Sequence, residues 1–442
     1  MYKKSNFIVN VDVFENGNML LFNTMSGVLG VVDVESLRLL ENADAITQDS
    51  ILNEKDKANL ETLLKSGYIL REEYDEHELL KLHSMRSRFF NESLSLTIAT
   101  TLDCNMSCPY CYEKRHAISK KGMCDETRSD LYEFVKRYMD SNPCKSLSVT
   151  WYGGEPLLSK DVVYDLSEKF IALCDEKGAS YSAGIVTNGV LLDYETAKKL
   201  ADDYKVKNVQ ITIDGMPEYH DVSRALIDGT PTFDTIINNI ENAKDLMHIT
   251  LRVNIDNENL RKATELKQLF YDDKGWHKNP SVYFSRIRDY DTCSYEKSCF
   301  MSEKDFSEFE FGLTKESYER DGNVHRVYPT KKNIFCTAHC IGSFVIDPEG
   351  YLYSCWNHVG IINESFGNVK TGIEQNRNYT KWIMFEESSK CTKCNFFPVC
   401  RGGCPFEYLE SGETQCLPWV YSYKNNLKLA YEDHIAKKQK TT

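Results

Sequence analysis

The stretch "SLTIATTLDCNMSCPYC", residues 95–111, decides the fold of this protein, because a β-rich run leads directly into three closely spaced cysteines. Cys104, Cys108 and Cys111 follow the spacing C-x3-C-x2-C on a predicted loop that leaves a strand. Structural metal sites usually take four protein ligands, so three thiolates around one iron–sulfur cluster leave one iron open to another ligand. The stretch therefore predicts a metal site with an open coordination position.

The pattern that surrounds this stretch predicts an α/β domain. Six β-rich runs alternate with five helix-like segments, whose apolar residues recur at three- and four-residue spacing. Such alternation implies parallel strands joined by right-handed crossovers, and we predict a partial (β/α)6 TIM-like barrel. The runs are 95–101, 146–152, 183–187, 208–214, 249–256 and 282–287, and the helical segments lie near 125–141, 159–177, 194–204, 232–246 and 258–272. Barrel chemistry sits at the C-terminal ends of strands, which is where Cys104 follows the first run.

The two flanks of this domain have other patterns. Residues 1–80 show three short strand patterns and two helical ones, which predict a winged-helix-like α+β module. Residues 81–94 are predicted to form a linker helix, residues 95–310 the barrel, and residues 311–442 a cysteine-rich iron–sulfur domain. A hairpin is expected around Pro348-Glu349-Gly350.

Length and charge narrow the class of protein. A chain of 442 residues is too long for one hydrophobic core, so we expect two or three domains. A formal net charge of −13 argues against nucleic acid or an anionic membrane as the main partner. No apolar stretch approaches the length of a membrane span, and the N-terminus lacks the apolar core of a signal peptide. These features predict a cytoplasmic protein.

Sixteen cysteines are many for that compartment, where disulfides do not persist, so metal is the better interpretation. Eleven of them fall into two groups, residues 104–111 and 336–416. We interpret the other five as small buried hydrophobes or incidental thiols; they are Cys124, Cys144, Cys174, Cys293 and Cys299.

A second motif, Gly153-Gly154-Glu155-Pro156, follows the second β-rich run. Glycines permit close backbone approach, and a carboxylate pairs well with an ammonium group. Together with the C-x3-C-x2-C spacing, this motif resembles the radical S-adenosylmethionine (SAM) enzymes. In these enzymes the amino and carboxylate groups of SAM chelate the open iron of a [4Fe–4S] cluster. The resemblance implies that Gly153, Gly154 and Glu155 run along SAM and bind its α-amino group; the alternative is a tight turn with a solvated Glu155.

Further polar residues are expected along the same rim. Asn188 in "TNG", Thr212 in "TIDG" and Arg224 follow later strand patterns, as do Arg252 and Asn254. The resemblance implies that such residues contact the ribose and carboxylate of SAM, and that the backbone of Tyr110 meets its adenine. A structural role in a turn is the alternative for each.

The C-terminal cysteines follow the order C-x3-C-x14-C from 336 to 355, then C-x2-C-x5-C-x3-C from 391 to 404, then Cys416. This order resembles the SPASM (twitch-type) extension of radical SAM enzymes, which holds two auxiliary [4Fe–4S] clusters. The resemblance implies one cluster on Cys336, Cys340, Cys355 and Cys404, and the other on Cys391, Cys394, Cys400 and Cys416. The alternative is structural zinc.

The N-terminal module resembles the leader-peptide recognition element of enzymes that mature ribosomally made, post-translationally modified peptides. Such elements bind an extended peptide against a strand edge, and a packing appendage is the alternative. The resemblance over the whole chain predicts a peptide maturase that cleaves SAM reductively and abstracts a hydrogen atom from a precursor peptide with a leader. We expect it to install a cross-link, a sactionine-type thioether first and a carbon–carbon bond second, with an electron donor such as flavodoxin or ferredoxin.

Two other functions stay open. An anaerobic sulfatase maturase would oxidise Cys or Ser to formylglycine, but about a hundred residues precede the cluster motif here, whereas that family begins close to it. That family also places a proposed catalytic Asp where this chain has Trp356, after the cysteine matching Cys355. We interpret the nearby Asp347 and Glu349 as solvated turn residues and identify no catalytic acid or base. The third function is a zinc-stabilised adaptor that binds peptides without catalysis.

Overall fold

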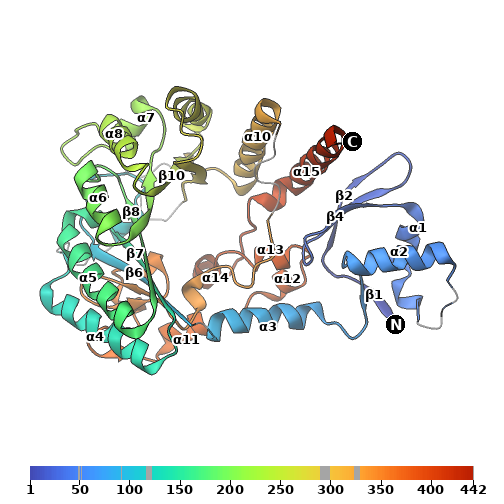
Figure 1. The fold of residues 1–442 in the computed structure, drawn as a ribbon, viewed down its shortest axis with the longest axis horizontal. Helices are drawn as coiled ribbons and strands as arrows, with labels where there is room; N and C mark the ends of the chain where they lie inside the picture. The colour runs from blue at the N-terminus through green and yellow to red at the C-terminus, as the bar shows by residue number, and fades with distance from the viewer. Residues whose placement is uncertain are drawn as a thin grey trace. The chain divides into compact units, whose positions relative to one another are not determined.

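The computed structural model describes residues 1–47, 50, 52–90, 92–115, 122–288, 299–322 and 329–441. The chain forms two compact units (Figure 1). Unit 1 comprises Met1–Phe89, Ser302–Thr337 and Glu386–Thr442, and unit 2 comprises Phe90–Met301 and Ala338–Phe385. None of the helices in the described ranges is long and apolar enough to span a bilayer.

An eight-stranded sheet forms the centre of unit 2, in the order β11-β10-β9-β8-β7-β6-β12-β13. Its first six members in the chain pair in parallel with their sequence neighbours, which confirms the predicted α/β class. These six strands are β6 (Ser93–Thr101), β7 (Ser146–Gly153), β8 (Ser180–Thr187), β9 (Val206–Thr212), β10 (His248–Ile255) and β11 (Ser281–Arg286). Because they are parallel, their C-terminal ends lie at one edge.

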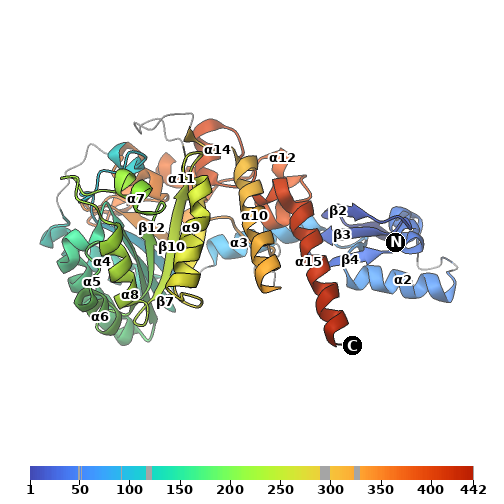
Figure 2. The same cartoon turned by 90° about the horizontal axis from the view of Figure 1, so that it is seen from above.

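Helices connect these strands and lie along the sheet (Figures 1 and 2). They are α4 (Asp125–Ser141), α5 (Lys160–Lys177), α6 (Tyr194–Asp202), α7 (Pro217–Ser223), α8 (Phe233–Ala243) and α9 (Ala263–Lys267). In α8 the buried residues Ile236, Ile237 and Ile240 recur at helical spacing, which explains the predicted helix there. The helix expected over 258–272 is instead the short α9, between a 3-10 turn (Leu260–Lys262) and a π turn (Gln268–Asp273).

The predicted hairpin is present as β12 (Ser343–Ile346) and β13 (Leu352–Tyr353), which pair antiparallel. Strand β12 also pairs in parallel with β6, with Ser343 opposite Ser95. The rest of unit 2 contains β14 (Gly367–Asn368), β15 (Gly372–Ile373) and α11 (Arg377–Ile383). The hairpin thereby extends the sheet beside the strand that leads to the first cysteines.

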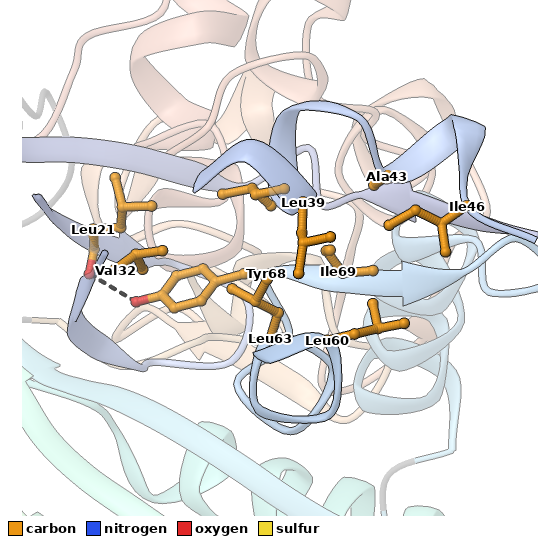
Figure 3. Close-up of a cluster of buried hydrophobic side chains, with 10 residues drawn as sticks. Leu21, Val32, Leu39, Ala43, Ile46, Leu60, Leu63, Tyr68 and Ile69 are labelled. Atoms are coloured by element: carbon orange, nitrogen blue, oxygen red, sulfur yellow. Dashed lines mark hydrogen bonds between the residues drawn. The ribbon is translucent and has the colours of Figure 1, made fainter. Parts of the chain in front are cut away.

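Unit 1 begins with the predicted α+β elements. An antiparallel sheet of β2 (Ile8–Val13), β3 (Met19–Asn23) and β4 (Leu29–Val32) accompanies α1 (Val34–Glu41), α2 (Glu54–Lys65) and the pair β1 (Tyr2–Lys4) and β5 (Ile69–Arg71). Leu21, Leu39 and Leu63 lie in their shared apolar core (Figure 3). The Tyr68 hydroxyl donates to the carbonyl oxygen of Leu21 at 2.8 Å, so this buried phenol has a hydrogen-bond partner.

Helices complete unit 1: α3 (Glu76–Phe89), α10 (Glu303–Asp321), α12 (Ser389–Thr392), α13 (Phe397–Cys400), α14 (Pro405–Ser411) and α15 (Trp419–Thr441). Leu427 of α15 packs against Val9, Val11 and Phe22 of the N-terminal sheet. The two units divide the chain differently from the boundaries expected at residues 80, 94 and 310, because residues 338–385 belong to unit 2. Those boundaries stay predictions.

Candidate active site

A cavity of about 450 Å³ lies at the C-terminal ends of the parallel strands. It is lined by residues that follow different strands, which is where ligands bind in α/β folds. The lining includes these residues singled out in the sequence: Cys104, Cys108, Tyr110, Cys111, Gly153, Gly154, Asn188, Thr212, Arg224, Arg252 and Asn254. Glu155 is not part of it.

The two glycines hold the cysteine loop against the end of β7. Gly153 has φ +123°, and a Cβ atom there would lie 2.1 Å from the carbonyl oxygen of Thr101. A Cβ atom on Gly154 would lie 2.3 Å from the carbonyl oxygen of Asp103. The Gly154 N–H donates to Thr101 O at 3.0 Å, so only glycine allows the loop to approach this closely.

Glu155 is fully buried in a hydrogen-bonded network, which excludes the solvated alternative. Its Oε1 accepts from the Thr187 hydroxyl at 2.8 Å and its Oε2 from the Asn188 N–H at 2.7 Å. A third bond comes from the Leu157 N–H at 3.0 Å. Burial raises the pKa of Glu155, and these hydrogen bonds oppose the rise. Glu155 thus joins the ends of β7 and β8, and its contact with SAM stays a prediction.

Asn188 continues this connection to the cysteine loop. Its Nδ2 donates to Asn105 Oδ1 at 2.7 Å, and its own Oδ1 accepts from the Val190 N–H at 3.0 Å. The side chain therefore fixes the loop between Cys104 and Cys108 while it lines the cavity.

Tyr110 lies in a buried polar network that the sequence did not predict. Its hydroxyl donates to Asp214 Oδ2 and accepts from Arg224 Nη1 at 2.9 Å. Burial raises the pKa of Asp214, and the Arg224 guanidinium opposes that rise. Arg224 Nε is buried and has no hydrogen-bond partner among the described residues. Asp214 was missed because in "TIDG" Thr212, two residues earlier, was taken as the ligand-facing residue.

The three cysteine thiols are suited to soft metal ligation. Cys108 is buried, and burial raises the pKa of Cys104 to about 11 and that of Cys111 to about 12. Such thiols stay protonated at neutral pH until a metal displaces the proton. Among the described residues no three His, Cys, Asp or Glu side chains could hold a single metal ion. Three thiols would leave one position of an iron–sulfur cluster open to another ligand.

Several lining residues were not foreseen: Tyr152, Arg286, Arg288, Trp356 and Glu113. The rings of Trp356 and Tyr152 pack against each other at a tilt of 46°, with centroids 4.6 Å apart. Burial, with repulsion from Glu155, raises the pKa of Glu113 to about 8. The available signal for Glu113 was an acidic residue two positions after the third cysteine, which sequence reasoning did not use.

The C-terminal cysteines are divided between the units. Unit 1 holds Cys391, Cys394, Cys400 and Cys416, as well as Cys336 and Cys404; unit 2 holds Cys340 and Cys355. Burial raises the pKa of Cys400, and Cys416 and Cys391 add to the rise; Cys394 and Cys391 act similarly on Cys416. These four thiols therefore lie within electrostatic range of one another, while both ligand sets stay predictions.

The isolated cysteines differ in burial. Cys174 and Cys299 are buried, Cys144 is half-buried and Cys124 is exposed, whereas Cys293 lies outside the described residues. The interpretation of Asp347 as solvated is wrong. It is fully buried, and it accepts from the Tyr353 hydroxyl and from the backbone N–H groups of Glu349 and Tyr351, each at 2.9 Å. Glu349 is exposed, as expected.

Comparison with known proteins shows which family has a cysteine loop and a sheet of this kind. Residues 98–270 match the Radical SAM superfamily. The chain is 23% identical over 359 residues to the cysteine-type anaerobic sulfatase-maturating enzyme of Clostridium perfringens (strain 13 / Type A), covering 74% of this chain and 93% of that protein. Native anSMEcpe with bound AdoMet and the Cp18Cys peptide has a similar fold, with 22% identity, 79% and 99% coverage, and a TM-score of 0.59.

Streptococcus suis SuiB has a similar fold over 94% of this chain and 97% of its own, with 15% identity and a TM-score of 0.53. A counterpart fold therefore exists for nearly the full length of the chain. Residues 98–270 are therefore a radical SAM domain, and the protein is an enzyme.

Proposed function

We propose that this protein oxidises a cysteine side chain of a protein or peptide substrate to formylglycine, as its relatives named cysteine-type anaerobic sulfatase-maturating enzymes do. The observation that carries this proposal is the similarity over 93% of such an enzyme. The cavity at the strand ends supports it, because the cysteine loop, the glycine pair and Arg224 meet there. The similarly folded anSMEcpe has been solved with bound AdoMet and the Cp18Cys peptide.

The comparisons contradict the cross-linking peptide maturase predicted first. The argument from the hundred residues before Cys104 fails, because nearly a whole sulfatase-maturating enzyme matches within 74% of this chain. An additional N-terminal module therefore does not separate the chain from those enzymes. The difference at position 356 remains, because this chain has Trp356 where that family places a proposed catalytic Asp. An indole cannot accept a proton, so any base must come from another residue.

The residues around the cavity fit a cluster and SAM. Cys104, Cys108 and Cys111 would hold a [4Fe–4S] cluster, and the unpartnered, buried Nε of Arg224 suits a carboxylate. When bound, SAM and the cluster supply a 5′-deoxyadenosyl radical that removes a hydrogen atom from an unactivated carbon. Tyr152, which is buried and packs against Trp356, would keep water from the reacting carbon together with the buried strand ends.

The remaining parts of the chain have proposed roles as well. Two auxiliary [4Fe–4S] clusters on the SPASM cysteines, with the ligand sets given above, would accept the electron released on substrate oxidation. Residues 1–80 would bind the substrate protein or peptide through a strand edge. A flavodoxin or ferredoxin would supply the first electron.

Anaerobic incubation of the reconstituted protein with SAM, a reductant and the Cp18Cys peptide tests the function. We expect the peptide to lose hydrogen sulfide and gain one oxygen, and to form a hydrazone with an aldehyde reagent. A product that has lost two hydrogens without an aldehyde would indicate cross-linking and overturn the proposal. Zinc in place of iron, without SAM cleavage, would support an adaptor.

A further inference from the structure

One tryptophan differs from the other four of the chain in its exposure. Trp151, Trp276 and Trp382 are fully buried, and Trp419 is half-buried. Trp356 is 39% exposed, and it lines the cavity at the strand ends. It belongs to none of the residue sets proposed above for the clusters or for SAM. Apolar surface that stays exposed in a cavity is typical of a ligand contact.

The structure around Trp356 fixes the ring in place. Trp356 begins the 3-10 turn Trp356–His358, and the next residue, Val359, is fully buried in the apolar cluster beside β12 and β13. The indole packs against Tyr152, which is only 6% exposed. Covering Tyr152 therefore explains the buried part of the indole and leaves its exposed part without a structural role.

The chemistry of the lining indicates which side chain fits against this exposed part. Removal of apolar surface from water favours an apolar group, and aromatic pairs gain further energy from tilted or offset geometry. A cation also binds the face of a tryptophan. However, the described lining holds four arginines and one glutamate, so a basic side chain would meet like charge there.

The contacts of Arg252 show that part of this positive charge is not neutralised locally. Its Nε donates to Asn254 Oδ1 at 2.8 Å, and its Nη2 donates to Ser285 Oγ at 3.0 Å. Both acceptors are neutral oxygens, so the charge of the guanidinium remains in the cavity wall. A neutral aromatic side chain therefore fits the exposed indole better than a basic one.

We propose that Trp356, supported by Tyr152, is a specificity-determining residue that binds a neutral aromatic side chain beside the reacting cysteine of the substrate. This inference rests on the proposed function, because it requires a cysteine substrate in this cavity. The position at which the resembling family places a proposed catalytic Asp thus serves substrate selection in this chain.

Steady-state kinetics with the anaerobically reconstituted full chain test this contact. The probes are the Cp18Cys peptide and versions of it in which one residue beside the cysteine, on either side, is replaced by Phe, Leu, Ser or Arg. Formylglycine formation is followed by mass spectrometry. Because an aromatic pair gains energy beyond area burial, we expect the KM of the better Phe version to be about 2- to 10-fold below that of the matching Leu version. The matching Arg version should have the highest KM.

Variants of the tryptophan separate substrate binding from support of the fold. Trp356→Ala should bring the KM of the Phe version to that of the Leu version, whereas Trp356→Phe should keep the difference. Trp356→Leu retains apolar bulk and should also lose the difference, so the test does not depend on the stability of the Ala variant. Tyr194→Ala, at an exposed aromatic residue of α6 outside the cavity, is the matched control and should keep the wild-type KM ratio.

The other outcomes are distinct. An equal fall in kcat for every peptide, with the KM ratio unchanged in Trp356→Ala and Trp356→Leu, would show that Trp356 only supports the fold and would overturn the inference. Equal KM values for the Phe and Leu versions with the wild type, a lower KM for the Arg version, or conversion of Cp18Cys but of no altered version would overturn it too. Wild-type protein that cleaves SAM but converts no peptide to formylglycine would refute the proposed function itself.

Discussion

The two cysteine-bearing regions that lie wholly within one unit are built in different ways. In unit 2, Cys104–Cys111 follows a nine-residue strand, and buried side chains from neighbouring strand ends hold the loop. In unit 1, Cys391–Cys416 is supported by three short helices, α12 and α13 with four residues each and α14 with seven. One of its connections to regular structure is to the N-terminal sheet, where Asn395 Nδ2 donates to Ile8 O at 2.7 Å.

The fold positions the first cysteine loop before any metal binds, whereas the second region needs its metal to complete its structure. The first loop has its position fixed by hydrogen bonds to the sheet, so a bound cluster adds chemistry to an existing frame. The second region has little regular structure, and in such regions metal binding supplies part of the folding free energy. We expect perturbations to affect the two regions in correspondingly different ways.

The largest expected effect is loss of the first cluster. Replacing Cys104, Cys108 and Cys111 together by Ala should abolish 5′-deoxyadenosine formation, measured by chromatography. It should remove about four of about twelve irons, because each [4Fe–4S] cluster holds four. The sheet should stay folded, since its hydrogen bonds do not involve these thiols. Cys124→Ala, at an exposed cysteine, is the control; SAM cleavage by the triple variant would contradict the assignment.

Iron removal should destabilise the second region more than the first. After anaerobic chelation we expect limited proteolysis to cleave within residues 386–416 first, because four-residue helices without metal ligation open readily. Residues 93–111 should stay protected by the sheet. Mass spectrometry of the fragments locates the cuts. Simultaneous cleavage of both regions would show that the first loop also depends on its metal.

Replacing Asp214 tests whether its network with Tyr110 and Arg224 stabilises the first cysteine loop. Asp214→Ala leaves the buried Arg224 guanidinium without its nearby carboxylate and removes the acceptor of the Tyr110 hydroxyl. Loss of one partner of a buried charge pair costs about 3–5 kcal/mol, so the thermal midpoint should fall clearly. Asp203→Ala, at an exposed carboxylate after α6, should leave it unchanged. An unchanged midpoint in Asp214→Ala would mean that the network does not stabilise the loop.

A smaller change should affect the second region alone. Asn395→Ala removes the bond to Ile8, and a neutral hydrogen bond contributes about 1 kcal/mol. We expect faster release of part of the iron to a chelator, with normal SAM cleavage during the same period. Asn142→Ala, at the exposed C-terminus of α4, should release iron at the wild-type rate. Equal release rates in both variants would argue against support from the N-terminal sheet.

The sequence predicted local structure better than the arrangement of side chains at the site. The strands of the sheet and helices such as α4 follow from periodic apolar residues, and the hairpin follows from Pro348-Glu349-Gly350. The pairing of β12 with β6 depends on residues far apart in the chain, so no local pattern indicates it. The inward orientation of Glu155 and the Tyr110–Asp214 bond also appear only once the strand ends are side by side.

The smallest expected effect is a pH dependence in the hairpin beside the first region. Burial raises the pKa of Asp347 from 3.8 to about 6, so between these values the folded state binds more protons than the unfolded state. The contribution of Asp347 is therefore full below about pH 4 and is lost as the pH rises through about 6. Asp347→Asn cannot titrate, so the thermal midpoint of the wild type should fall relative to this variant over that interval. A difference between the two midpoints that stays constant from pH 4 to pH 7 would show that Asp347 titrates normally, and that the hairpin supports the first region through its hydrogen bonds alone.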